Sequence, residues 1–178
     1  IVSPDGKNIV PAKISETRYR FTPARAGRYA AGAEINPGFM SKTTTGRVKR
    51  NKTGLDNVIN CMRFDIRAKT VITAGEDGRR ARVSAGHPLE IVPLDDTAHL
   101  RKNGVLTVMA TYNGSPLANS VIEASHEGFH GRDHPAALSV KTDSKGTARI
   151  PLSHGGKWIL QVKHNEPYPD KAVCDNYM

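Results

Sequence analysis

Apolar and polar residues alternate over short stretches of this chain, and we find no sustained apolar spacing of the helical kind. In the first half the alternation is clearest at residues 61–68, and we expect this strand to continue through Ile72. Two shorter strands are predicted at residues 18–21 and 28–34, on either side of a turn, with Tyr29 facing the core.

The second half shows the same period more regularly. It predicts six strands, at residues 89–94, 106–112, 120–125, 138–142, 148–152 and 158–163. Residues 143–146 form a turn signal that predicts a hairpin between the strands at 138–142 and 148–152. In the last strand Trp158, Leu160 and Val162 are expected to face inward together, because side chains two apart share a face.

Turn residues punctuate the whole chain, which has 11 prolines and 16 glycines. Ser3-Pro4-Asp5-Gly6 predicts a β-turn, Asn36-Pro37-Gly38 predicts a break, and the polar residues 39–56 predict a long loop. We therefore predict an all-β protein of two antiparallel β-sandwich domains in tandem, immunoglobulin-like or transthyretin-like. The first would span residues 1–85 and be truncated at its N-terminus, and the second would span residues 86–178.

Composition narrows the classes of function. No apolar run approaches the roughly 20 residues of a membrane span, so we expect no transmembrane segment. The formal net charge is +9, with one dense cluster at Arg47, Lys49, Arg50 and Lys52. Aromatic residues are only 6% of the chain and none lies in that cluster, which argues against nucleic-acid binding and favours a solvated loop.

The two cysteines, Cys61 and Cys174, lack the C-x-x-C spacing of a zinc ribbon. They are either two buried thiols or one disulfide. A disulfide is plausible if the protein is exported, and it would close a loop of about 110 residues, worth on the order of 4–5 kcal/mol in the chain-entropy model.

The second half carries a recognisable pattern. The string YNGSPLANSVIEAS…KTDSKGTARIPLSHGGKWILQVKH resembles transthyretin-like and carboxypeptidase-regulatory-like sandwiches, with signature residues Gly114, Pro116, Asp143, Gly146 and Trp158. With GHPLEIVPL and FTPARAGRYAAGAEINPGFMSKTTTG added, the chain from about Arg20 resembles a periplasmic family of unknown function found beside bacterial nickel and cobalt uptake systems.

That resemblance implies a periplasmic or otherwise exported bacterial protein whose partner is a membrane transporter or another envelope protein. Members of the family are expected to begin with a His-containing, export-processed N-terminus and to end with a further strand. Neither feature is found between Ile1 and Met178, so any metal role of such an N-terminal histidine does not carry over to these residues.

Three histidines form the most suggestive cluster, at His126, His130 and His134. Gly128, Gly131 and Pro135 argue against a helix there, but in a loop the imidazoles can converge, with Glu127 or Asp133 as an oxygen ligand. Imidazole suits nickel, cobalt, copper and zinc. A polar surface loop with scattered histidines is the competing interpretation, and His87 is interpreted as a structural hydrogen-bonding residue.

We find no G-x-S-x-G nucleophile motif and no phosphate-binding loop in the sequence. The sequence therefore leaves two hypotheses, neither of them an enzyme. One is an exported binding protein that handles divalent nickel, cobalt or zinc. The other is a structural or protein-interaction module of the cell envelope without a metal role.

Overall fold

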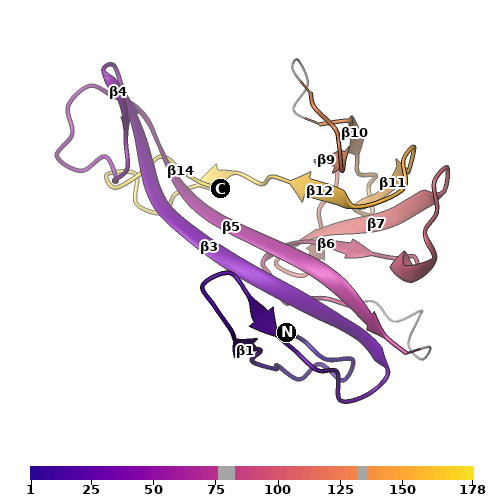
Figure 1. The fold of residues 1–178 in the computed structure, drawn as a ribbon. Helices are drawn as coiled ribbons and strands as arrows, with labels where there is room; N and C mark the ends of the chain where they lie inside the picture. The colour runs from indigo at the N-terminus through magenta and orange to yellow at the C-terminus, as the bar shows by residue number, and fades with distance from the viewer. Residues whose placement is uncertain (76–82, 132–135) are drawn as a thin grey trace. The chain divides into compact units, whose positions relative to one another are not determined.

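The computed structural model describes residues 1–75, 83–131 and 136–178, and these residues form an almost entirely β structure (Figure 1). Within them the helical structure is a single 3-10 turn, η1 (Thr97–His99). The strands are β1 (Ala12–Lys13), β2 (Tyr19–Arg20), β3 (Gly27–Thr43), β4 (Gly46–Val48), β5 (Val58–Ala74), β6 (Leu89–Pro93), β7 (Val105–Tyr112), β8 (Ser115–Pro116), β9 (Val121–His126), β10 (Leu138–Lys141), β11 (Thr147–Pro151), β12 (Trp158–Val162), β13 (Glu166–Pro167) and β14 (Asn176–Tyr177).

The strands pair into four sheets. One small sheet joins β1 to β2, a second has the order β10-β9-β12, a third has the order β11-β7-β6 with β8 beside β7, and the fourth has the order β13-β14-β5-β3-β4. The strand β14 pairs with β5 in parallel. The pairs β1–β2, β9–β10, β7–β11, β9–β12, β13–β14, β3–β4, β6–β7 and β7–β8 are antiparallel. No helix in the described part of the chain is long and apolar enough to cross a membrane.

The chain forms two compact units, each built from segments distant in sequence. The first comprises residues 1–32 and 69–162, and the second comprises residues 33–68 and 163–178. The long strands β3 and β5 contribute residues to both. Residues 85 and 86, between which the sequence predicts a domain boundary, both lie in the first unit.

The core of the first unit lies between the sheets β10-β9-β12 and β11-β7-β6. Alternate side chains of β7, β9 and β11 are fully or almost fully buried there, as the period-2 pattern requires. The members are Leu106, Val108, Ala110, Ile122, Ala124, Ala148, Ile150 and Leu152. Trp158, Leu160 and Val162 pack against this cluster from β12, which confirms their predicted inward orientation.

The six strands predicted in the second half are all present, but the predicted hairpin between β10 and β11 is wrong. β10 pairs with β9, whereas β11 pairs with β7 in the other sheet. The turn signal itself is real, because the Asp143 carboxylate accepts hydrogen bonds from the amides of Lys145 and Thr147. The turn is therefore an arch that carries the chain from one sheet to the other across the core.

Two predictions about the first half also need correction. The Asn36-Pro37-Gly38 signal does not break the chain, and the predicted loop from residue 39 is a strand as far as Thr43, followed by the short strand β4. Gly38 has a φ of +78° and its amide donates to the side-chain oxygen of Asn36. The signal thus makes a local irregularity that β3 absorbs, as prolines and glycines in exposed strands commonly do.

Other local predictions for the first unit are confirmed. Ser3-Pro4-Asp5-Gly6 forms a turn closed by a 2.9 Å hydrogen bond from the Gly6 amide to the Ser3 carbonyl. Tyr29 is 1% exposed, packs edge-on against Phe21, and donates its hydroxyl to the Arg25 carbonyl four residues upstream. This bond gives the buried phenol the partner that it needs.

Candidate functional site

The three histidines of the predicted metal cluster have different positions. His126 is the last residue of β9, paired in register with Trp158 of β12. His130 is exposed in the loop that follows, and His134 lies outside the described residues. Within residues 1–75, 83–131 and 136–178, no three His, Cys, Asp or Glu side chains are grouped closely enough to hold a metal ion.

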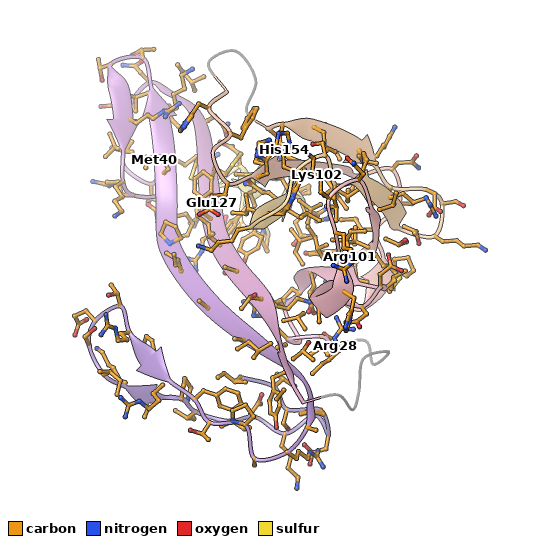
Figure 2. The ribbon with its side chains drawn as sticks, turned by 45° about the vertical axis from the view of Figure 1, so that its right-hand side comes forward. Arg28, Met40, Arg101, Lys102, Glu127 and His154 are labelled. Carbon is orange, nitrogen blue, oxygen red and sulfur yellow. A yellow bond between two sulfur atoms is a disulfide. The ribbon has the colours of Figure 1, made fainter. Side chains whose placement is uncertain are left out.

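His126 is instead brought against a histidine from another loop. The rings of His126 and His154 are stacked, with their centroids 3.7 Å apart and their planes 13° from parallel. His154 is exposed and lies between β11 and β12, and Figure 2 labels it together with Glu127. Trp158 and Phe129 complete an aromatic surround, with ring centroids 5.3 Å and 5.9 Å from that of His126.

Each stacked ring has one nitrogen engaged within the protein. The Nδ1 atom of His126 lies 2.9 Å from the carbonyl oxygen of Glu127, and the Nδ1 atom of His154 lies 2.9 Å from the hydroxyl of Ser153. A carbonyl only accepts, so Nδ1 of His126 carries the proton and the lone pair of the neutral ring is on Nε2. Metal-binding histidines are commonly held in this way, with one ring nitrogen on a protein acceptor.

The backbone around the pair is tied to the sheet. The indole N–H of Trp158 donates to the His154 carbonyl at 3.0 Å, and the Glu127 amide donates to the Lys157 carbonyl at 2.9 Å. The Glu127 carboxylate lies 3.5 Å from the ammonium of Lys157. These contacts join the loop after β9 to the loop before β12, so the two histidines have a defined spacing.

Sequence reasoning did not select His154. It lies 28 positions from His126, and no ligand spacing links the two. The only signal that could have found it is the pairing of β9 with β12, which places the chain before Trp158 beside the end of β9. That pairing is a long-range property that period-2 alternation does not specify.

The other described histidines are not part of this arrangement. The ring of His87 packs against the backbone of Gly32, where a Cβ atom would come within 2.8 Å of its Nε2. His99 lies 2.6 Å from the Asp96 carboxylate, and hydrogen bonding from His99 lowers the pKa of Asp96 below its usual value. His164 follows β12 and belongs to the second unit.

The first unit also has a small pocket of about 130 Å³, lined by Val2, Ser3, Pro4, Gly6, Arg28, Val83 and Ser84. The two serine hydroxyls in its lining form hydrogen bonds within the protein. Ser3 donates to Asp5 and Ser84 donates to Glu90, while the Arg28 guanidinium lies 3.5 Å from the Thr97 hydroxyl. Nothing in this lining combines a nucleophile with a general base.

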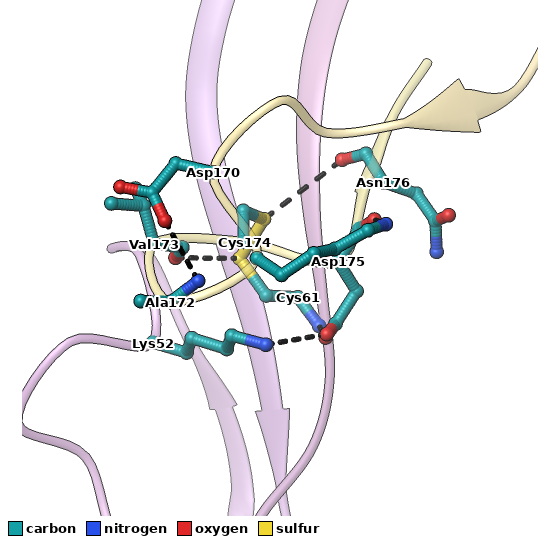
Figure 3. A network of polar contacts seen from close by, with 9 residues as sticks. Lys52, Cys61, Asp170, Ala172, Val173, Cys174, Asp175 and Asn176 are labelled. Carbon is teal, nitrogen blue, oxygen red and sulfur yellow. Dashed lines mark hydrogen bonds and ion pairs between the residues drawn. A yellow bond between two sulfur atoms is a disulfide. The ribbon is translucent and has the colours of Figure 1, made fainter.

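In the second unit Cys61 of β5 and Cys174 form a disulfide that is fully buried (Figure 3). Beside it the Asp175 carboxylate accepts from the Cys61 amide at 2.7 Å and from the Lys52 ammonium at 2.5 Å. The hydrogen bond from Lys52 lowers the pKa of Asp175 against the opposing effect of desolvation. A disulfide points to an oxidising, extracytoplasmic location.

No curated protein and no solved structure gives a significant match to the chain. Residues 1–166 do match one protein family, which is described as a domain of unknown function (DUF4198). The matched range contains the stacked histidine pair and Cys61, and it ends before Cys174. Because this range covers almost all of the 178 residues, the chain belongs to the DUF4198 family.

Proposed function

We propose that this protein is an exported, non-catalytic protein of two β-sandwich domains in tandem, which binds a divalent transition metal through His126 and His154. The observation that carries the proposal is the closeness of the two rings, with each Nδ1 atom engaged within the protein. A metal lies in the plane of each imidazole that binds it, so the two rings would tilt out of their stack to share one ion. Its resemblance to a periplasmic family found beside nickel and cobalt uptake systems supports nickel or cobalt as cargo and a membrane transporter as partner.

The number of donors favours transfer of the metal rather than permanent storage. Structural zinc sites use four protein ligands and catalytic ones three. The described residues offer two imidazoles here, so the remaining coordination positions would be open to water or to the ligands of a receiving protein. Imidazole nitrogen binds nickel, cobalt, copper and zinc, and not the oxygen-seeking calcium or magnesium.

Calorimetric titration with Ni²⁺, Co²⁺ and Zn²⁺ tests the proposal. We expect saturable binding by the intact protein near pH 7.5, and a loss of at least about tenfold in affinity in His126→Ala and in His154→Ala. His99→Ala is the matched control, because His99 is an exposed histidine of the same unit whose ring contacts Asp96. No heat, or no affinity tighter than about 1 mM in the wild type, would contradict the proposal.

The second candidate is a structural or protein-interaction module of the cell envelope. It is favoured by the apolar side chains that the second unit exposes on β3 and β5, where Ile35 is 61%, Ile59 58% and Ile66 49% exposed. Apolar residues mark an interface where they form one contiguous patch, and a partner docked on β3 and β5 would cover these side chains. Retention of a specific envelope protein by the wild type, lost on Ile35→Ser and Ile66→Ser, would support this role.

A further inference from the structure

A second feature of the molecule, separate from the histidine pair, is the positive charge of the hairpin formed by β3 and β4. Residues 35–55 contain five cations, at Lys42, Arg47, Lys49, Arg50 and Lys52, and no Asp or Glu. The whole stretch belongs to the second unit. Figure 1 shows β4 beside the end of β3, at the tip of this unit's sheet.

The register of the hairpin sets two of these cations against each other. Lys42 of β3 is the direct cross-strand partner of Arg47 of β4, and both are exposed. Directly opposed side chains have Cβ atoms about 5 Å apart, and like charges at such positions are destabilising. A neutral or acidic residue at either position would therefore make the hairpin more stable than this pair of like charges does.

Nothing within the described chain neutralises this pair. Lys42, Arg47 and Lys49 make no ion pair or side-chain hydrogen bond with any residue of the described ranges. Lys52 differs, since its ammonium is held by Asp175. The Arg50 guanidinium donates to the Thr53 carbonyl, which carries no net charge.

Hydrogen bonds from side chains and from the backbone hold the hairpin that carries these charges in a defined conformation. The Thr43 hydroxyl donates to the Gly46 carbonyl and accepts from the Thr45 amide, and the Ser41 hydroxyl donates to the Arg50 carbonyl at 2.9 Å. The Thr44 amide donates to the Asn57 carbonyl, which joins the tip to the start of β5. A prearranged set of cations loses little entropy when an anion binds it.

We propose that the β3–β4 hairpin binds the phosphate-bearing surface of an anionic lipid membrane, with Lys42 and Arg47 sharing one headgroup phosphate. Four cations spread over residues 42–50 suit an extended anionic surface better than one small ion. Val48, 36% exposed between Arg47 and Lys49, adds an apolar side chain of the kind found at membrane interfaces. The cluster has no aromatic residue for stacking on bases, which disfavours nucleic acid.

Vesicle co-sedimentation tests the inference with the full chain. We expect the wild type to bind phosphatidylcholine vesicles that contain phosphatidylglycerol, to ignore pure phosphatidylcholine vesicles, and to be released at about 1 M salt, where the Debye length is about 3 Å. Each cation near the surface contributes about fivefold in binding, so Lys42→Gln/Arg47→Gln should weaken it by roughly 25-fold.

The matched control is Lys141→Gln/Arg149→Gln, which removes the same two residue types from exposed positions of the first unit. Its binding should equal that of the wild type. Equal losses in both double variants would mean that net charge alone acts, and would overturn the inference. So would wild-type binding to both kinds of vesicle alike, or binding to an oligonucleotide but not to vesicles. The inference would also be overturned if inorganic phosphate released the protein from the vesicles at a much lower ionic strength than chloride does. That result would indicate a discrete phosphate site.

Discussion

Glu90 is the acidic residue on which the interior of the first unit depends most. Its carboxylate accepts hydrogen bonds from the Lys69 ammonium, the Ser84 hydroxyl and the Ala85 amide, and its side chain is only 3% exposed. Burial would raise the pKa of Glu90, but these hydrogen bonds outweigh it and lower the pKa below the usual value. For Lys69, desolvation is the larger effect and lowers the pKa despite the Glu90 partner.

We predict that Glu90→Gln lowers the free energy of unfolding by about 3 kcal/mol, because it leaves the buried Lys69 charge without its anion. Urea unfolding at pH 7 measures the change. Glu16→Gln is the control, since Glu16 is 92% exposed and pairs with Lys13 at the surface, and it should change stability by less than about 0.5 kcal/mol. Equal effects of the two substitutions would contradict this account.

Glu90 also makes the stability of the protein depend on pH, and the direction of its pKa shift fixes the sign of that dependence. A carboxyl whose folded pKa is lowered adds stability that is complete above its unfolded pKa of about 4.3 and is lost as the pH falls through the folded value. The stability difference between wild type and Glu90→Gln should therefore narrow as the pH drops below about 4. Other carboxyls titrate alike in both proteins, so the difference isolates Glu90, and a gap that widens in acid would refute the assignment.

At the scale of elements, the arch between β10 and β11 decides how the two sheets of the first unit connect. Gly146 in this arch has a φ of +72°, and a Cβ atom there would lie 2.8 Å from the Ala110 carbonyl oxygen and 2.9 Å from the Leu117 nitrogen. Gly114 in the turn between β7 and β8 has nearly the same φ, +78°, with nothing within 4 Å of such an atom. The two glycines thus share one conformation in different surroundings.

We predict that Gly146→Ala destabilises the protein by about 3 kcal/mol, since it adds a backbone clash to the left-handed conformation. Gly114→Ala should cost only about 1 kcal/mol, for the conformation alone. Thermal unfolding of the pair separates the two contributions. If the two substitutions lowered stability equally, the requirement for glycine at position 146 would not come from close packing of the arch against β7.

At the scale of the whole molecule, the disulfide joins positions 113 residues apart and holds the C-terminal segment to β5. Around it, β14 pairs in parallel with β5, Tyr168 packs against Phe39, and the Tyr177 hydroxyl donates to Asp65. The strands of the C-terminal segment, β13 and β14, are only two residues long, so the cross-link supplies much of the attachment to β5.

We predict that Cys61→Ala/Cys174→Ala lowers the stability of the protein by about 4 kcal/mol, because a loop of this length then regains its freedom in the unfolded state. The fall in melting temperature measures the loss. The described chain has no free cysteine, so the double variant should not respond to reductant, whereas the wild type refolded under reduction should behave like the variant. Unchanged melting in the variant would show that strand pairing alone holds the segment.

The chain's own pattern determined where most strands of the first unit lie. Alternation placed β6, β7, β9, β10, β11 and β12 to within a residue or two and oriented Trp158 toward the core, because burial of one face of a strand is written locally in a period of two. Turn residues located the Asp143–Gly146 turn, and the distribution of charge located the cationic stretch around Arg47.

Tertiary structure alone decided which strands pair and which distant side chains meet. A strand with a buried face can join either sheet, so nothing local assigns β10 to β9 and β11 to β7. His126 was selected from the sequence as one of three neighbours, yet it stacks on His154, because β9 and β12 are adjacent in the sheet. The opposition of Lys42 and Arg47 likewise follows from the register of a hairpin in a stretch that was predicted to be a loop. Strand positions follow from local burial, whereas the candidate sites depend on long-range pairing that alternation leaves open.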